Sequence, residues 1–229
     1  MKIGIIGAGN IGGTLARRFK GAGHQVFIAN SRGPATLASL AREIGAKAVT
    51  VKEAARSGNV VIVTIWEKNI TDLPKDLFDG VPQDVVVVDT GNYYPQQRDG
   101  RIDAIENGTA ESRWVSNQLG RPVVKAFNSI YAEHLLEYGR PSGSDGRIAL
   151  PVAGDDRKAK EVVMQLIDEI GFDALDAGSL DESWRQQPGT PVYCTDLDAD
   201  GVRRGLAEAK RERPAKFRAT AGNPAKARR

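Results

Sequence analysis

The residues with the clearest chemical potential lie at the start of the chain, where three glycines recur at a spacing suited to a bound phosphate. The run Gly7-Ala8-Gly9-Asn10-Ile11-Gly12 follows the apolar stretch 3–6 and precedes an amphipathic stretch over 14–20. Gly7 permits a tight turn, Gly9 lets the backbone approach a pyrophosphate, and Gly12 allows a helix to pack closely on a strand. The free N–H groups at the helix start favour a phosphate there. The sequence therefore predicts a dinucleotide-binding unit.

The second predicted strand ends in residues that indicate which dinucleotide is bound. The apolar stretch 26–29 is followed by Asn30, Ser31 and Arg32, whereas NAD-binding proteins usually carry Asp or Glu here to bind the ribose 2′-hydroxyl. A hydroxyl and a guanidinium can instead donate hydrogen bonds to the 2′-phosphate of NADP. Each such bond is worth roughly 1.5–3 kcal/mol, so two favour NADP over NAD by about a hundredfold or more. We therefore predict NADP(H) as the cofactor.

The composition argues against several other kinds of chemistry. Cys194 is the only cysteine, which excludes an internal disulfide and a cysteine-based zinc site, and the two histidines, His24 and His134, form no cluster. We predict no metal site. The chain shows no signal-peptide pattern and no apolar run approaching twenty residues, so we expect a cytoplasmic protein without membrane contact.

Basic residues concentrate at the end of the chain. Residues 210–229 contain eight Lys and Arg side chains and one acidic residue, Glu212, although the formal net charge of the whole chain is only +3. Such a tail could contact nucleic acid or acidic lipid, but no basic face with interleaved aromatic residues accompanies it, and we predict no nucleic-acid partner. We therefore divide the chain into an NADP-binding domain over 1–209 and a basic tail over 210–229 that is solvated or contacts another subunit.

Apolar runs alternate with amphipathic stretches along the chain. The runs at 60–65 and 85–88 are continuous rather than alternating, which is typical of strands buried on both faces. We predict an α/β fold of the Rossmann type, with a doubly wound, mostly parallel sheet and helices on both faces. Further strands are expected near 48–51 and at 123–127, 148–152 and 172–175, and helices at 34–44, 52–56, 155–170 and 199–211.

Residues just beyond the carboxyl ends of the strands are candidates for ligand contact, because open α/β sheets bind ligands there. Trp66 follows the run 60–65, and Asn92 and Asn128 follow the next two predicted strands. Trp66 either lines the cleft or simply packs against neighbouring residues. The two asparagines either orient a substrate carbonyl or cap the next helix, or do both.

No side chain stands out as a catalytic group. His134 is a lone histidine that we expect at the surface of a helix, and Ser129 lacks both the Gly-x-Ser-x-Gly turn and the histidine partner of a nucleophile. Asp155 and Asp156 open a predicted helix, where carboxylates act as caps. We therefore predict no catalytic residue.

Four segments at or after predicted strands carry a more specific signal than the glycine run. They are Asn30-Ser31-Arg32-Gly33-Pro34, Asp89-Thr90-Gly91-Asn92-Tyr93-Tyr94-Pro95, Val124-Lys125-Ala126-Phe127-Asn128-Ser129-Ile130 and Val152-Ala153-Gly154-Asp155-Asp156. Together they resemble the NADPH-dependent F-420 reductase family, also called coenzyme F-420-dependent NADP oxidoreductase. The similarity covers roughly residues 1–180.

The resemblance implies hydride transfer between NADPH and the deazaflavin coenzyme F-420, with both ring systems stacked in the cleft. Direct transfer between two cofactor carbons needs orientation and exclusion of water rather than a nucleophile, which agrees with the lack of an acid–base pair. The resemblance also implies the cofactor contacts. Gly7, Gly9, Asn10, Ile11 and Gly12 would contact the pyrophosphate, Ser31 and Arg32 beside Asn30 the 2′-phosphate, and Thr64, Ile65, Trp66, Ala126, Phe127 and Asn128 the nicotinamide side.

The acceptor side is open to several interpretations. Because F-420 carries a phosphate and a glutamyl tail, its site should offer basic groups, for which Arg98, Arg101, Arg140 and Arg185 are candidates. Residues 184–191 form either a lid or floor over the acceptor or a connector to the closing helix, so the short C-terminal extension of the domain is expected to form the acceptor site.

Other functions remain compatible with the same residues. The acceptor could be a flavin, a quinone or an imine, or the chain could be a non-catalytic NADP(H) sensor. By analogy with the family we expect a homodimer acting on a small-molecule redox acceptor.

Overall fold

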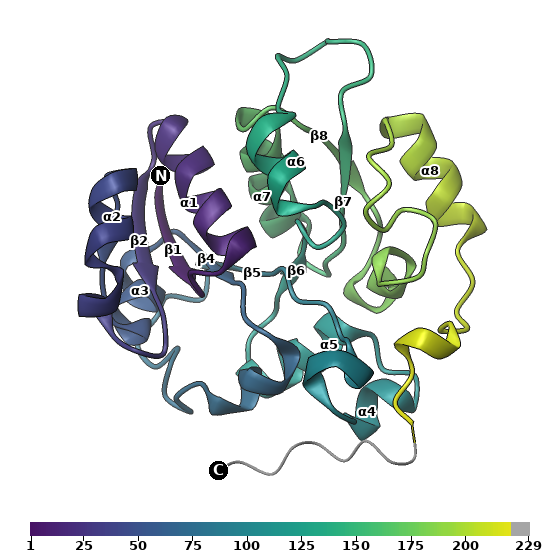
Figure 1. Ribbon diagram of the computed structural model, residues 1–229, viewed down its shortest axis with the longest axis horizontal. Coiled ribbons are helices and arrows are strands. Elements are labelled where there is room, and N and C mark those ends of the chain that lie inside the picture. The colour runs from purple at the N-terminus through teal and green to yellow at the C-terminus, as the bar shows by residue number, and fades with distance from the viewer. Residues whose placement is uncertain (221–229) are drawn as a thin grey trace.

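The computed structural model describes residues 1–220, which fold around a six-stranded parallel sheet (Figure 1). The strand order is β3-β2-β1-β4-β5-β6, and every neighbouring pair runs parallel. This is the order of dinucleotide-binding sheets, so the predicted Rossmann-type fold is confirmed. The strands are β1 (Lys2–Ile6), β2 (Gln25–Ala29), β3 (Lys47–Ala48), β4 (Val60–Val63), β5 (Val86–Asp89) and β6 (Val124–Lys125).

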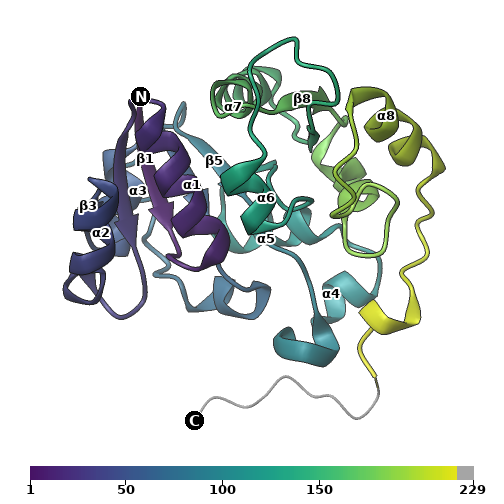
Figure 2. The ribbon, with the colours of Figure 1, turned by 45° about the horizontal axis from the view of Figure 1, so that its top comes forward.

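Helices cover both faces of this sheet because successive strand side chains point to opposite sides. Ile3 and Ile5 of β1 pack in one core with α1 (Asn10–Gly21) and α7 (Arg157–Glu169), whereas Ile6 packs in another with α3 (Val51–Ser57). Figure 2 shows α1 lying over the strands and α3 behind them. The remaining helices are α2 (Ala38–Ile44), α4 (Asp103–Glu106), α5 (Glu111–Leu119), α6 (Ala132–Glu137) and α8 (Ala199–Glu208).

Two predicted strands of the main sheet form a separate sheet instead. β7 (Ala149–Val152) and β8 (Asp173–Asp176) pair in parallel with each other, and a single antiparallel bridge between Lys125 and Ala153 connects them to β6. This small sheet packs between α7 and α8, with Val202 and Leu206 of α8 against Ala149. A later segment, with Tyr193 and Cys194, lies beside Thr64, Thr90 and Phe127, which follow β4, β5 and β6.

The segment after α8 returns along the side of the molecule toward α4 and α5 (Figure 1). Phe217 lies in the short turn η5 (Ala215–Phe217) and packs edge-on against Tyr94, with ring centroids 5.7 Å apart. Gln96 donates hydrogen bonds to the carbonyl oxygens of Ala215 and Arg218. The first half of the predicted basic tail therefore packs on the domain, while residues 221–229 lie outside the described part of the chain.

Candidate functional site

A cavity of about 760 Å³ lies at the carboxyl ends of β1, β2 and β4. It is bounded by the glycine turn after β1, the loop after β2 and the segment after β4. Of the predicted cofactor residues, it is lined by Gly7, Gly9, Asn30, Ser31, Arg32, Thr64, Ile65 and Trp66. The strand order thus brings together side chains that are distant in the sequence.

The three glycines of the turn have different structural requirements. Gly7 has φ +116°, and a Cβ there would lie 2.1 Å from the Thr64 carbonyl oxygen. At Gly12 a Cβ would lie 1.9 Å from the Gly7 oxygen, so the packing of α1 on the turn requires glycine. A Cβ on Gly9 would meet nothing within 4 Å. Gly9 therefore faces open space, next to the start of α1, which has no side-chain cap and no acidic residue in its first turn.

The loop after β2 is held by Asn30 and presents Arg32. Asn30 Oδ1 accepts a hydrogen bond from the Arg32 N–H at 3.0 Å, and Asn30 Nδ2 donates to Thr36 Oγ1 at 3.0 Å. Ser31 and Arg32 are exposed, and the Arg32 guanidinium makes no hydrogen bond or ion pair within residues 1–220. Ser31 and Arg32 are therefore available to an anionic ligand in the cavity.

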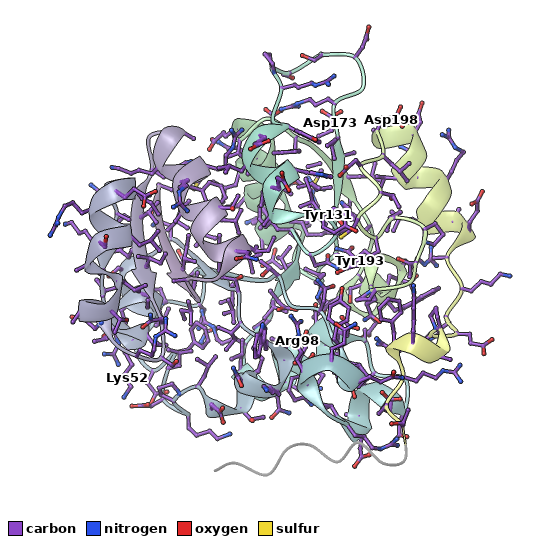
Figure 3. All side chains as sticks on the ribbon, viewed as in Figure 1. Lys52, Arg98, Tyr131, Asp173, Tyr193 and Asp198 are labelled. Atoms are coloured by element: carbon purple, nitrogen blue, oxygen red, sulfur yellow. The ribbon has the colours of Figure 1, made fainter. Side chains whose placement is uncertain are left out.

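A second cavity of about 560 Å³ adjoins the first. The two share Gly9, Thr64, Ile65 and Trp66 as lining residues. Trp66 is 49% exposed, so it lines the cleft rather than packing in the core. The second cavity is also lined by Asn10, Ile11, Asn92, Tyr94, Arg98, Phe127, Asn128, Tyr131, Tyr193 and Cys194, and Figure 3 shows Arg98, Tyr131 and Tyr193 in the middle of the molecule.

Arg98 is the one of the four predicted arginines that lines this second cavity. Its guanidinium lies 5.6 Å from the Trp66 ring centroid and 4.8 Å from that of Tyr94, and its Nη2 donates to the Asn92 carbonyl oxygen at 2.5 Å. The other three arginines are engaged elsewhere. Arg101 pairs with Asp103, Arg140 donates to the Asp145 carbonyl oxygen, and Arg185 pairs with Glu182.

Asn92 and Asn128 bind each other rather than capping helices. Asn128 Nδ2 donates to Asn92 Oδ1 at 3.0 Å and to the Gln186 carbonyl oxygen at 2.7 Å, and Gln186 Nε2 donates to Asn128 Oδ1 at 2.9 Å. The residue at the start of α6 is Tyr131, with no side-chain cap, so the capping interpretation of Asn128 is wrong. The Asn128 amide is used internally and fixes the backbone of the cavity wall.

The segment 184–191 supports the second cavity from outside. Gln186 is fully buried behind Asn128, whereas the cavity wall itself comes from Tyr193 and Cys194 a few residues later. The Tyr94 and Tyr193 hydroxyls form a short hydrogen bond, and the Cys194 N–H donates to the Ser129 carbonyl oxygen at 2.8 Å. Burial raises the pKa of the Cys194 thiol to about 11, so the thiol is neutral at pH 7.

Not every predicted cofactor residue lines a cavity. Ala126 is fully buried, and neither Ala126 nor Gly12 lines either cavity. Phe127 does line the second cavity and has φ +61°, a left-handed conformation that is uncommon for an aromatic residue and often marks functional sites. Asp156 accepts hydrogen bonds from the N–H groups of Lys158 and Ala159, which confirms the predicted cap of α7.

Next to Gly91, at the wall of the second cavity, lies a buried group of charged side chains that the sequence did not predict. Lys125 Nζ donates to Asp89 Oδ2 at 3.2 Å and to the Gly91 carbonyl oxygen at 2.5 Å. Glu67 is fully buried, and neither of its carboxyl oxygens has a hydrogen-bond partner in the described chain. The sequence contains one hint of this group: Lys125 lies within the apolar run 123–127, and Asp89 ends the apolar run 85–88.

The protonation of this group follows from burial and neighbouring charges. Burial, reinforced by the negative charge of Asp89, raises the pKa of the Glu67 carboxyl well above its usual range. Burial alone would lower the pKa of Lys125, but attraction to Asp89, Glu111 and Glu67 outweighs it and raises that pKa. Lys125 is therefore charged, and through Gly91 it fixes the loop at the rim of the second cavity.

His134 lines neither cavity, and its ring is engaged by neighbouring side chains. Its Nδ1 lies 2.5 Å from Asp196 Oδ2, and its ring stacks on Tyr138 with centroids 4.5 Å apart. The His134 side chain is 24% exposed, which makes it less exposed than the surface position predicted for it.

Within residues 1–220, His, Cys, Asp and Glu side chains form no group of three or more placed to hold a metal ion. None of the helices in that range combines the length and apolar character needed to span a bilayer.

Comparison with known proteins agrees with this geometry. The family described as NADP oxidoreductase coenzyme F420-dependent matches residues 2–93. The crystal structure of the hypothetical protein SMa0349 of Sinorhizobium meliloti is 34% identical and superposes with a TM-score of 0.73, covering 87% of this chain and 96% of that one. The strand order, the glycine turn and the family match together place the chain in the Rossmann class of dinucleotide-binding folds. The chain belongs to the F420-dependent NADP oxidoreductase family.

Two further relatives match over parts of their length. The protein YjhV of Escherichia coli K12 is 47% identical over 78 residues, which are 34% of this chain and 57% of that protein. Metalloreductase STEAP3 of Rattus norvegicus is 29% identical over 180 residues, which are 78% of this chain and 34% of that protein. The chain therefore spans less than two thirds of the length of either relative.

Proposed function

We propose that this protein transfers a hydride between NADP(H) and the deazaflavin coenzyme F-420. The observation that carries the proposal is the junction of the two cavities at Thr64, Ile65 and Trp66. A dinucleotide whose 2′-phosphate lies at Ser31 and Arg32 would extend past Gly9 toward this junction. The second cavity then offers room for an acceptor ring beside the nicotinamide.

The residues of the first cavity fit a dinucleotide phosphate. Gly9 leaves open space where a side chain would otherwise stand, and α1 begins there with N–H groups that no side chain caps. Arg32 offers a guanidinium with no partner in residues 1–220. The free cation and the free N–H groups together favour a ligand with two separated anionic groups, as NADP(H) has.

The second cavity orients the partner and excludes water rather than supplying an acid or base. Bound NADP(H) and F-420 would themselves supply the carbon atoms between which the hydride moves. Ile65, Trp66 and Phe127 provide apolar walls, and the bonded pair Asn92 and Asn128 fixes the loops behind them. Arg98 pairs with the buried Asp99 through Nε at 3.2 Å, and its guanidinium can donate further hydrogen bonds to the anionic part of the acceptor. Holding two rings in reacting geometry can contribute about 7–11 kcal/mol.

One observation supports a second candidate, an NADPH-dependent reductase with another acceptor such as a flavin. The family match ends at Tyr93, whereas half of the residues that line the second cavity, Tyr94 and Arg98 among them, lie beyond it. The relative that aligns over 180 residues is a metalloreductase. The NADP side of the site is therefore better supported than the identity of the acceptor.

The test is to follow NADPH absorbance with purified protein and oxidised F-420, with FMN as the control acceptor. Rapid oxidation with F-420 and not with FMN supports the proposal. Oxidation with FMN alone supports the second candidate. Tight NADPH binding without oxidation by either acceptor would point to a sensing role.

A further inference from the structure

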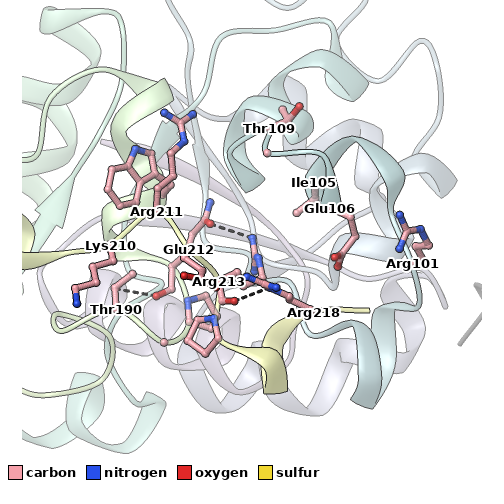
Figure 4. A pocket seen from close by; sticks show the side chains of 16 residues that line it. Arg101, Ile105, Glu106, Thr109, Thr190, Lys210, Arg211, Glu212, Arg213 and Arg218 are labelled. Atoms are coloured by element: carbon pink, nitrogen blue, oxygen red, sulfur yellow. Dashed lines mark hydrogen bonds and ion pairs between the residues drawn. The ribbon is translucent and has the colours of Figure 1, made fainter. Parts of the chain in front are cut away.

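A third cavity, of about 430 Å³, lies between α4, the end of η4 (Leu180–Gln186) and the segment after α8 (Figure 4). It shares no lining residue with the two cavities of the candidate site. We call it the C-terminal pocket. The proposed function does not use it.

The charges around the C-terminal pocket are predominantly positive. It is lined by five basic side chains and by two acidic ones, Glu106 and Glu212. Of the basic side chains, Arg101, Arg213 and Arg218 already form ion pairs. Lys210 and Arg211 form none with any residue of the described chain, although the Arg211 guanidinium lies 5.7 Å from the Trp184 ring centroid. Two positive charges in the wall therefore remain without a counterion.

Two buried hydrogen-bond donors in the wall also lack partners. Gln187 is 6% exposed, and its Oε1 accepts from Arg213 Nη2 at 3.0 Å, which fixes the amide nitrogen on the opposite side. That Nε2 has no partner in the described chain, and neither has the buried Nε1 of Trp184. Because a buried donor without an acceptor destabilises the fold, these two groups indicate a ligand rich in acceptor oxygens.

We propose that the C-terminal pocket is a second ligand site, which binds a small polyvalent anion of phosphate or carboxylate chemistry. The oxygens of such an anion satisfy the N–H groups of Trp184 and Gln187, and its charge neutralises Lys210 and Arg211. Figure 4 shows Arg211, Lys210 and Arg213 on the C-terminal segment, with Lys210 and Arg211 pointing in different directions, and Glu106 and Arg101 on the side of α4. A ligand there connects the two sides of the pocket and stabilises the folded C-terminal segment by mass action.

The test is calorimetric titration of the full chain with two probes, inorganic pyrophosphate and citrate, in the presence of saturating NADPH, which occupies the candidate site. We expect saturable binding of at least one probe with a stoichiometry of one, and a rise in Tm at saturation. Binding of pyrophosphate alone identifies the phosphate class, and binding of citrate alone the carboxylate class. The absence of saturable binding by both would overturn the proposal.

Variants of residues in and outside the C-terminal pocket show whether the probe binds there. Arg211→Ala and Gln187→Glu should each weaken binding at least tenfold. Trp184→Phe, which keeps an aromatic side chain and removes the N–H, should weaken it severalfold. Arg204→Ala, an equal charge change at an exposed position of α8, should leave affinity unchanged. Weakening by Arg204→Ala equal to that by Arg211→Ala would refute a site in the C-terminal pocket. Thermal unfolding of each variant without probe checks that it folds.

Discussion

Arg213 lies 102 residues beyond Glu111 in the chain, yet its Nη1 is 2.7 Å from Glu111 Oε1. The Glu111 carboxylate is fully buried, and the Arg213 side chain is only 14% exposed. Glu111 also contributes to the raised pKa of Lys125. The segment after α8 therefore supplies a counterion to the buried charges beneath the second cavity.

Replacing Arg213 should destabilise the fold. Arg213→Ala leaves the Glu111 carboxylate buried without its cation, which costs about 3–5 kcal/mol. Glu111→Gln in the same chain should recover most of the loss, because the uncompensated charge is gone. Chemical denaturation measures all three proteins, and Lys216→Ala, in the same segment, is the control. An Arg213→Ala protein as stable as wild type would show that the ion pair contributes nothing.

Glu67 should make stability depend on pH in a particular direction. Its pKa is raised by burial and by Asp89, so its contribution to stability is complete below the unfolded pKa of about 4.3 and is lost as the pH rises toward the folded value. Glu67→Gln removes this loss. The stability of the variant relative to wild type should therefore increase from about pH 4.5 to pH 8. Thermal unfolding across that range tests this, with the exposed Glu137→Gln as control, and a difference independent of pH would contradict it.

Arg32 should distinguish the two dinucleotides. Arg32→Ala is expected to weaken NADPH binding by about 10–100-fold, because a hydrogen bond to a charged group is worth roughly 1.5–3 kcal/mol. NADH, which has no 2′-phosphate, should lose little affinity. Fluorescence titration of both ligands measures the two Kd values, and Arg42→Ala, an exposed arginine of α2, is the matched control. Equal losses for both dinucleotides would place the 2′-phosphate elsewhere.

The glycines of the turn should separate folding from binding. Gly9→Ala adds a methyl group in open space, so the protein should keep its Tm while NADPH affinity falls by about tenfold or more. Gly12→Ala places a Cβ 1.9 Å from the Gly7 oxygen and should lower the free energy of unfolding by about 1–3 kcal/mol. Tm and Kd are measured for both variants. A Gly9→Ala protein with unchanged NADPH affinity would mean that the phosphates do not pass this turn.

Arg98 should act on the acceptor and not on NADPH. Arg98→Ala removes the cation beside Trp66 and Tyr94, and we expect the KM for F-420 to rise about tenfold while the Kd for NADPH stays the same. Arg140→Ala and Arg185→Ala, whose guanidinium groups lie outside both cavities, should change neither value. If either control raised the KM as much as Arg98→Ala does, the acceptor would bind elsewhere.

The main sheet was predictable because its evidence is local. The runs in β4 and β5 are continuous and apolar, which is how strands covered on both faces look in a sequence. β7 is apolar in the same way, and β8 has only Ala174 and Leu175 between two aspartates. A short apolar run shows that a strand is buried but not which strand lies beside it. For this reason the sequence suggested one sheet where the structure has two.

The candidate site likewise has parts that a local sequence pattern predicts and parts that depend on contacts between distant residues. The glycine turn and the loop Asn30 to Arg32 act within a few residues, so their place in the first cavity could be predicted. Tyr94 and Tyr193 meet across 99 residues, and Gln186 reaches Asn128 across 58, through contacts that no local pattern contains. The sequence also gave no reason to expect Glu67 in the interior, because a lone glutamate is usually exposed.

The most direct test of the account is the fate of the hydride. NADPH deuterated at the 4R or the 4S position is incubated with the protein and oxidised F-420, and the reduced acceptor is analysed by mass spectrometry. Direct hydride transfer predicts that one of the two labels, and not the other, appears in reduced F-420. Reduced F-420 without deuterium from either label, or no reduction at all, would contradict direct transfer between the two cavities.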